Sequence, residues 1–318
     1  MRDVFFIVGP TATGKSEIAA DVARELGAEI VSADAFQVYR GLDLLTAKPD
    51  AATLAKVPHH LIGAMSILEG MNAEKFRTLA LQAISEIYSR GRLAIVVGGS
   101  GLYIKAVTHG LSITPAADPD LRAQLNELGL ADLGRKLREL DPKTAVDLKN
   151  RRRVVRAIEI CLLSEKPASG LRKEWKEGVV TADAPIGRLP PETAATTTQG
   201  VFLFRERDDL YQRINVRVET MFENGVIEEV RAMTGAISET ACKMIGLREI
   251  RDLLDGKMSI LQCVAAIQQA TRRYAKRQLT WFRRQTNFQA LNLSVLSHVE
   301  SVKWISQKVR LAFAQGND

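Results

Sequence analysis

Residues 4–16 read VFFIVGPTATGKS, and this stretch decides the fold. The apolar residues 4–8 predict a buried β-strand, and the pattern G-x-x-x-x-G-K-S after them predicts a phosphate-binding loop between a strand and a helix. Glycines let backbone N–H groups turn toward an anion, and a helix expected at about 16–26 adds the positive end of its dipole. We therefore expect the chain to bind a di- or triphosphate through Gly9, Pro10, Thr11, Ala12, Thr13, Gly14, Lys15 and Ser16.

The first 112 residues alternate between predicted strands and helices. Strands are expected at 29–33 and 93–97, helices at 73–90 and 102–108, and a strand at 201–204 is expected to return to the same sheet. The strands are apolar throughout, which is typical of a parallel sheet covered by helices on both faces. The sequence thus predicts an α/β fold, with a P-loop core whose mainly parallel sheet is flanked by helices. Because ligands bind at the carboxyl ends of such strands, the P-loop, Asp34 and Ser100 are expected to share one crevice.

The middle of the chain differs in character from the sequence on either side. Residues 115–167 are charged and helical in pattern, with helix starts expected at Asp118-Pro119 and Asp141-Pro142, and residues 166–200 are rich in Pro, Gly, Ala and Thr. We expect an α/β core at 1–114 and 199–318, and a mostly helical insertion domain at 115–198 that ends in a flexible, Pro/Thr-rich segment near 185–198. Helices are expected over most of 209–284 and again after residue 293.

Composition narrows the class of protein. The chain has 318 residues and a net charge of +7. Its three cysteines are far apart and its four histidines form no zinc pattern, which indicates reduced thiols and no zinc finger. The first strand begins almost at Met1, which leaves no room for a signal peptide, and no apolar run approaches the length of a membrane span. We expect a cytoplasmic protein with no membrane association, and a monomer.

Asp34 separates this chain from the common P-loop ATPases and GTPases. In those proteins a second strand ends in an acid that holds magnesium, whereas the strand at 93–97 is followed here by Gly98-Gly99-Ser100. The acid instead follows the strand at 29–33, beside the P-loop, and the GTPase pattern N-K-x-D is absent. This favours a small-molecule kinase or another transferase, with Asp34 at the acceptor site. An aspartate at a strand end also caps turns, and that alternative stays open.

Two basic segments point to a large anionic partner. Residues 149–156 contain five basic residues and residues 271–284 contain six, and neither segment contains an acid. On a helix, Arg273, Arg277 and Arg284 form one stripe, while Ala275, Leu279 and Phe282 form a buried stripe. Tyr274 and Trp281 lie on a third face, where they would stack on a base or pack in the core. A single basic run is usually a solvated face, but two such runs favour binding to a nucleic-acid backbone.

The chain resembles the bacterial tRNA dimethylallyltransferases, also called tRNA isopentenyltransferases, from Gly9 to about Arg284. The resemblance rests on an ordered series of motifs: GPTATGKS (9–16), SADAFQVYRGLD (32–43), TAKP (46–49), VPHHLI (57–62), VGGSGLY (97–103), DPDLR (118–122), RRVVRAIE (152–159), LYQRINVRV (210–218), IGLRE (245–249) and TRRYAKRQLTWFR (271–283). Many unrelated proteins share the P-loop, whereas TAKP, VPHH and RYAKRQLTWFR in this order are specific to the family.

The resemblance implies transfer of a dimethylallyl group from dimethylallyl diphosphate to N6 of the adenine immediately 3′ of the anticodon, position 37. The tRNAs concerned read codons that begin with U. The P-loop would then hold an isoprenoid diphosphate rather than ATP, with Mg²⁺ as cofactor and Ser16 as its candidate ligand. Lys15 and Arg217 would neutralise the departing diphosphate, and Asp34 would accept a proton from N6. Ser100 stands where the family usually has threonine and keeps the hydroxyl. The implied catalytic residues are Asp34, Lys15, Ser16, Ser100 and Arg217.

The resemblance implies that the RNA partner is the tRNA anticodon stem-loop, with the target base flipped out of its stack. It also implies that the core at 1–114 and 199–318 is catalytic and that the insertion domain at 115–198 contacts the tRNA. Lys243 stands where relatives commonly have glutamine, which replaces an amide by a cation. The resemblance and the two basic segments together predict RNA contacts at Asp34, Ala35, Phe36, Gln37, Ser100, Arg122, Arg152, Arg153, Arg156, Lys243, Arg248, Arg273 and Arg277. Two other classes stay open: an ATP-dependent P-loop kinase of a small metabolite, and a non-catalytic RNA-binding protein that uses the P-loop only as an anion site.

Overall fold

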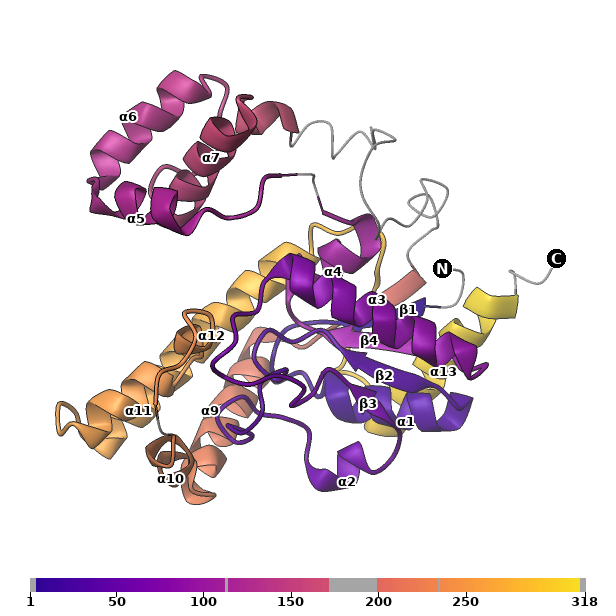
Figure 1. Ribbon diagram of the computed structural model, residues 1–318. Helices are drawn as coiled ribbons and strands as arrows, with labels where there is room; N and C mark the ends of the chain where they lie inside the picture. The colour runs from indigo at the N-terminus through magenta and orange to yellow at the C-terminus, as the bar shows by residue number, and fades with distance from the viewer. Residues whose placement is uncertain (1–3, 112–113, 172–198, 234, 315–318) are drawn as a thin grey trace. The chain divides into compact units, whose positions relative to one another are not determined.

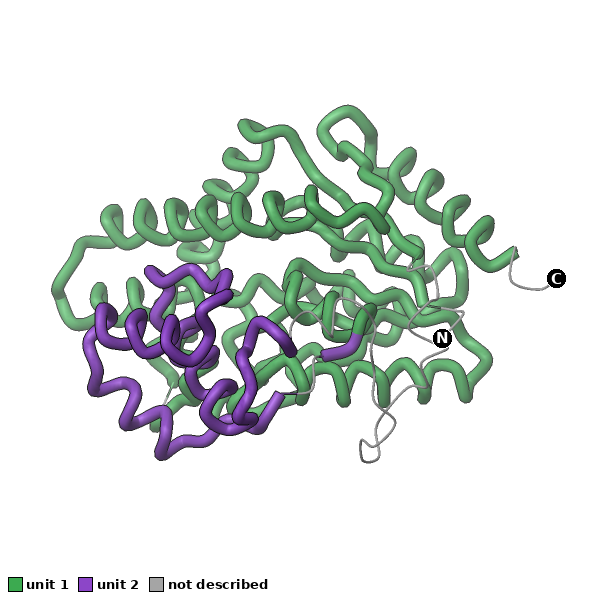
Figure 2. The backbone as a smooth tube through the Cα atoms, turned by 90° about the horizontal axis from the view of Figure 1, so that it is seen from above, with its two compact units in different colours: residues 1–109, 195–318 green, residues 110–194 purple. Residues whose placement is uncertain are grey.

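The structure is a computed structural model that describes residues 4–111, 114–171, 199–233 and 235–314. The chain divides into two compact units, one formed by residues 1–109 with 195–318 and the other by residues 110–194 (Figure 2). The boundaries expected from composition, at 115 and 198, lie a few residues beyond these limits. The segment 185–198, for which flexibility was expected, lies outside the described residues.

The first unit is built on a six-stranded sheet (Figure 1). In chain order the strands are β1 (Val4–Val8), β2 (Glu29–Ser32), β3 (His59–His60), β4 (Ala94–Gly98), β5 (Gln199–Phe204) and β6 (Gln289–Asn292). Their order across the sheet is β3-β2-β4-β1-β5-β6, and every pairing between them is parallel. The predicted α/β class and the return of β5 to the sheet are confirmed. The short edge strands β3 and β6 carry too few apolar residues to have been expected.

Both faces of the sheet are buried, which explains the continuous apolar strands. Within β1, Val4, Phe6 and Val8 belong to one core cluster, while the alternating Phe5 and Ile7 belong to another. This alternation follows from the period of two in a strand. All five residues are less than 10% exposed.

Helices cover each face. Residues of α1 (Lys15–Leu26) and α13 (His298–Ala314) join the cluster of Phe5, and residues of α3 (Ala73–Ser89) and α4 (Gly101–His109) join the cluster of Phe6. The remaining helices of this unit are α2 (Ala51–Leu54), α9 (Arg207–Glu223), α10 (Val226–Arg231), a 3-10 helix (Ala241–Lys243), α11 (Leu247–Leu254) and α12 (Ile260–Phe282). In the described part of the chain, no helix is both long and apolar enough to cross a membrane.

The second unit contains α5 (Pro119–Glu127), α6 (Leu130–Leu140) and α7 (Arg151–Ser164), packed around a core that includes Leu125, Leu137 and Ile158. The helix start at Asp118 is confirmed, because its carboxylate accepts from the N–H groups of Asp120 and Leu121. The helix start expected at Asp141 is wrong. Asp141 ends α6, and its buried carboxylate accepts hydrogen bonds from Ser169 N and Oγ, so it is not available to cap a following helix.

Candidate functional site

The P-loop lies at the carboxyl end of β1, the central position at which the strand order reverses. Gly14 has φ 91° and directly precedes Lys15, the first residue of α1, so the chain enters the helix through a left-handed residue that favours glycine. Gly9 is packed so closely that an added Cβ would lie 2.2 Å from the carbonyl oxygen of Leu203. Thr13 Oγ1 donates to Pro10 O at 3.0 Å across the loop. The loop therefore has a fixed path over the sheet.

Side chains from the last third of the chain hold the first part of this loop. Arg217 of α9 donates from Nη1 to Thr11 Oγ1 at 2.9 Å, and Gln278 of α12 accepts from the Thr11 N–H at 2.9 Å. Gln278 also donates to Gly99 O at 2.8 Å, so one buried amide joins the P-loop to the turn after β4. Sequence reasoning missed Gln278, although an uncharged polar residue on the buried stripe of a basic helix was a usable signal.

Positive charge is crowded around the loop. Burial lowers the pKa of Lys15 to about 8, opposed by the charge of Asp34 and assisted by that of Arg217. Burial likewise lowers the pKa of Arg217 to about 10, although the charge of Asp34 acts in the opposite direction. Among the described residues, neither cation forms an ion pair with a carboxylate. A bound anion would relieve this desolvated, like-charge arrangement.

Asp34 follows β2 and faces this positive charge. Its Oδ1 accepts from the N–H groups of Phe36 at 2.9 Å and Gln37 at 3.2 Å, so the turn-capping alternative is realised for one carboxylate oxygen. Capping and catalysis are compatible here, because the second oxygen is not needed for the turn. Asp34 lines two neighbouring pockets, and is the one residue that both linings share.

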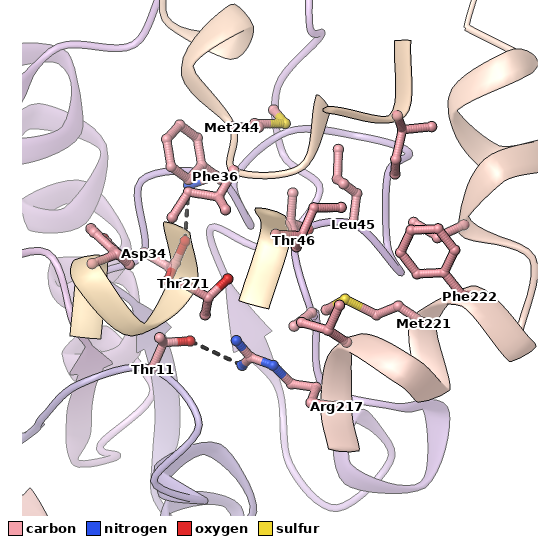
Figure 3. Close-up of a pocket in the computed structure, with 17 residues that line it drawn as sticks. Thr11, Asp34, Phe36, Leu45, Thr46, Arg217, Met221, Phe222, Met244 and Thr271 are labelled. Carbon is pink, nitrogen blue, oxygen red and sulfur yellow. Dashed lines mark hydrogen bonds between the residues drawn. The ribbon is translucent and has the colours of Figure 1, made fainter. Parts of the chain in front are cut away.

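The larger pocket has an empty volume of about 670 Å³, part of it open to solvent (Figure 3). Thr11, Asp34 and Arg217 lie on one side of it, where Figure 3 shows Arg217 reaching toward Thr11. Most of the rest of the wall is apolar and comes from four parts of the chain, within residues 36–47, 218–226, 244–250 and 267–274. Its members include Leu45, Val218, Met221, Phe222, Met244, Ile250 and Ile267. The smaller pocket is more polar and is lined by residues that include Lys15, Ser16, Gln37 and His59.

The turn after β4 carries Ser100, directly before α4. Its carbonyl accepts from Ile104 N at 3.0 Å, which is the position of an N-cap residue, and its own N–H donates to Ala33 O at 3.3 Å. The glycines on each side allow close packing, since a Cβ on Gly98 would lie 2.3 Å from Ala33 O and one on Gly101 would lie 2.5 Å from the Trp281 ring. Ser100 therefore sits beside the residue before Asp34, but outside the linings of these two pockets.

The RNA-contact residues predicted in the first unit fall into two groups. Phe36 and Gln37 lie in the pocket walls on either side of Asp34, with Ala35 in the same turn. Lys243, Arg248, Arg273 and Arg277 are exposed. Lys243 pairs with Glu239, Arg248 contacts Glu249, and the Arg277 guanidinium lies 5.7 Å from the centroid of the Tyr274 ring. Tyr274 lines the larger pocket, whereas Trp281 packs edge-on against Phe282.

The RNA-contact residues predicted in the second unit also fall into two groups. Arg152 and Arg153 are exposed in the first turn of α7. Arg122 and Arg156 instead bind the buried carboxylate of Glu159, with Nη-to-Oε2 distances of 2.9 and 2.5 Å. Their contact with RNA stays a prediction, and the structure gives each of them a partner within the fold.

A magnesium ion would have few protein ligands here. In the part of the chain that the structure describes, no group of three or more His, Cys, Asp or Glu side chains could hold a metal. Magnesium is commonly bound by one or two protein oxygens, water and substrate phosphates, and the Ser16 hydroxyl beside the P-loop fits that mode.

Comparisons with known proteins agree with this arrangement. A family model described as IPP transferase matches residues 37–285. The chain is 41% identical to tRNA dimethylallyltransferase 1 of Citrifermentans bemidjiense over 93% of its own length and 95% of the relative's. It is 42% identical to tRNA dimethylallyltransferase of Geobacter sulfurreducens, over 87% and 88%.

Solved structures extend the likeness to three dimensions. The full-length tRNA isopentenylpyrophosphate transferase from Bacillus halodurans has a TM-score of 0.68 and 33% identity, with full coverage of both chains. A eukaryotic dimethylallyltransferase acting on tRNA has a TM-score of 0.75 at 24% identity, covering 99% of this chain and 79% of that one, which supports the fold. The transferase interpretation is thus favoured over the kinase alternative, and the chain belongs to the IPP transferase family.

Proposed function

We propose that this protein transfers the dimethylallyl group of dimethylallyl diphosphate to N6 of adenine 37, immediately 3′ of the anticodon, in tRNAs that read codons beginning with U. The observation that carries the proposal is the larger pocket. It places the cationic Arg217, which is hydrogen-bonded to Thr11, beside an apolar wall, with Asp34 at the junction. A prenyl diphosphate has the same division into an anionic head and an apolar tail, whereas ATP does not.

The phosphate side supports departure of the diphosphate. As N6 attacks the allylic carbon, the C–O bond breaks and its electron pair leaves on the diphosphate oxygen. Lys15 and Arg217 are fixed close to the P-loop before the reaction, so they stabilise the developing negative charge without reorganisation. Their burial strengthens this effect, because charges interact more strongly in a poorly solvated site.

The acceptor side supplies the base. The amine on N6 is a poor nucleophile because its lone pair is delocalised into the adenine ring. Asp34 would take one N6 proton as the C–N bond forms, so that the product amine is neutral. The Phe36 and Gln37 N–H groups fix the orientation of this carboxylate, since both donate to Oδ1.

Magnesium is part of the proposal. Ser16 would hold the ion together with oxygens of the bound diphosphate. When bound, the ion would supply charge neutralisation of the leaving group. Mutation of the serine to alanine is expected to raise the magnesium concentration needed for inorganic diphosphate binding, which calorimetry reports without turnover.

The RNA is proposed to dock on exposed arginines, with Arg273 and Arg277 of α12 contacting the backbone of the anticodon stem-loop. Adenine 37 would leave the base stack to reach Asp34. The proposal includes a monomeric protein in the cytoplasm, where tRNA is found.

Radiolabelled dimethylallyl diphosphate tests this function directly. Purified protein, magnesium and an unmodified phenylalanine tRNA anticodon stem-loop are incubated with it, and a matched stem-loop has guanine at position 37. Label transferred to the adenine substrate alone supports the reaction and its site. Absence of transfer, with ATP turnover on a small acceptor instead, would replace this proposal with the kinase.

A further inference from the structure

The sequence motif LYQRINVRV places two arginines, Arg213 and Arg217, one helical turn apart on α9. Of the two, only Arg217 has a role in the proposed reaction. In the structure both side chains reach the P-loop, at different positions along it. Arg217 reaches Thr11 Oγ1, whereas Arg213 donates from Nε to Ala12 O at 3.0 Å.

The two arginines differ in depth. Arg217 lies within the wall of the larger pocket and its Nε is buried without a hydrogen-bond partner among the described residues. Arg213 is exposed. Its Nη2 lies 3.5 Å from the position that a Cβ on Gly14 would occupy, directly above the turn into α1. Arg213 therefore stands at the outer edge of the anion-binding loop. Its Nε is used by Ala12 O, and its two Nη groups form no hydrogen bond within the described residues.

A third arginine shows what a purely structural role looks like here. Arg205 donates from Nε to Thr13 O at 2.9 Å, and from Nη1 to both Asp209 Oδ2 and Leu293 O. Its charge is matched by a carboxylate at 2.9 Å. Within the described residues Arg213 has no carboxylate within ion-pair distance, although it uses the same Nε-to-carbonyl bond.

Like charges meet at this edge. Partial desolvation beside the loop lowers the pKa of the largely exposed Arg213, and the neighbouring Arg205 lowers it further, although Asp209 and Glu17 act in the opposite direction. Arg213 in turn lowers the pKa of Arg217. Holding these cations together costs free energy in the free protein, and a multiply charged anion over the loop would offset that cost.

We propose that Arg213 binds the terminal phosphate of the donor diphosphate, while Lys15 and Arg217 bind the phosphate attached to the prenyl carbon. This rests on the proposed function and adds a specificity-determining residue to it. Arg213 lets the site distinguish a diphosphate from a monophosphate, because a monophosphate seated at Lys15 and Arg217 does not extend to the outer edge. An arginine supplies parallel N–H donors to one phosphate, which a lysine at this position could not.

The test measures binding rather than turnover, by calorimetry with dimethylallyl diphosphate and dimethylallyl monophosphate. Arg213→Gln is compared with the wild-type protein and with Arg231→Gln, an exposed arginine of α10. We expect Arg213→Gln to lose about tenfold or more in diphosphate affinity, as for one charge-assisted hydrogen-bonding group, with little change for the monophosphate. Arg231→Gln should bind both as the wild-type protein does. Arg213→Lys keeps the charge but lacks the paired N–H donors of a guanidinium, and its diphosphate affinity should lie between those of the wild-type protein and Arg213→Gln.

Two results would overturn the assignment while leaving the proposed function intact. One is unchanged discrimination in Arg213→Gln. The other is an equal loss for both ligands, which would mean that Arg213 acts only by holding Ala12 O. A wild-type protein that transfers no prenyl group and binds neither ligand would instead contradict the proposed function itself. Thermal unfolding of each variant separates loss of a contact from loss of the fold.

Discussion

Asp34 and Glu159 are both carboxylates close to two basic side chains, but the structure uses them in opposite ways. Glu159 is fully buried and accepts hydrogen bonds from Arg122, Arg156 and the Asp118 N–H. Asp34 is partly exposed to two pockets and affects Lys15 and Arg217 through its charge, without an ion pair to either within the described part of the chain. One carboxylate is saturated by its cations, and the other keeps an oxygen open to a ligand.

The difference separates structural charge from functional charge. Burial disfavours the charged form of Glu159, but hydrogen bonds from its arginines outweigh this and hold its pKa below the usual value. Around the P-loop the balance is reversed, since burial lowers the pKa of Lys15 and no carboxylate compensates fully. Cations that the fold leaves under-compensated are the ones available to an anionic substrate.

The largest effect should come from Asp34→Asn. The amide oxygen can still accept from the Phe36 and Gln37 N–H groups, so the unfolding free energy should change by less than about 1 kcal/mol. The proton acceptor is lost, and the single-turnover rate of prenyl transfer should fall by roughly 10²–10⁴. Asp255→Asn, on the exposed end of α11, is the control. A large loss of stability with an unchanged rate would place Asp34 in the same class as Glu159.

Glu159→Gln should have the opposite effect, because it should lower stability rather than the rate of prenyl transfer. Replacing the charge leaves Arg122 and Arg156 without a buried counter-ion, so the unfolding free energy should fall by about 3 kcal/mol. Because the pKa of Glu159 is lowered in the folded protein, its contribution is complete above the unfolded pKa and is lost as pH falls through the folded pKa. Denaturant unfolding at several pH values measures both effects, with Glu127→Gln on the exposed side of α5 as the control. Unchanged stability with weakened tRNA binding would contradict a structural role for Glu159, and with it the contrast to Asp34.

Sequence reasoning succeeded where the signal is local. Strand β1 is apolar at every position because both faces are buried, and a P-loop needs only the order strand, loop and helix. Placing the loop, Asp34 and Ser100 at one end of the sheet followed from parallel strands having their carboxyl ends together. The start of α5 at Asp118 followed from its Asp-Pro pair.

The parts that could not be predicted depend on partners distant in sequence. Thr11 and Gln278 are 267 residues apart, and Ala12 and Arg213 are 201 apart, so no local pattern connects them. Asp141 failed as a helix start for the same reason, because Ser169, 28 residues later, occupies its carboxylate. The division of the basic residues into paired and available cations likewise required the position of Glu159.

Lys15 allows a direct test of whether the cations near the P-loop lack a compensating carboxylate, although the expected effect is smaller than for Asp34 or Glu159. Its pKa of about 8 in the free protein should rise when an anion binds, so binding of inorganic diphosphate above pH 8 should take up a proton. The affinity for inorganic diphosphate should then fall as pH rises, approaching about tenfold per pH unit well above the pKa of Lys15 in the free protein. Calorimetry at pH 8.5 in two buffers of different ionisation enthalpy measures the uptake. The Lys15→Met variant should lose that component, and equal uptake by both proteins would show that Lys15 is already compensated.

Arg152 and Arg153 should show the smallest effect, and they decide whether the comparison extends to RNA. They occupy the same first turn of α7 that leads to Arg156, but both are exposed, so glutamine at these positions should leave the unfolding free energy nearly unchanged. If each contacts a phosphate, the slope of log affinity for the anticodon stem-loop against log salt should become less steep by about 1 per arginine. Arg138→Gln, exposed on α6, controls for general loss of positive charge. Filter binding across a salt series gives both slopes. An unchanged slope would mean that neither arginine contacts a phosphate, and that exposure alone does not mark the RNA-binding arginines of this unit.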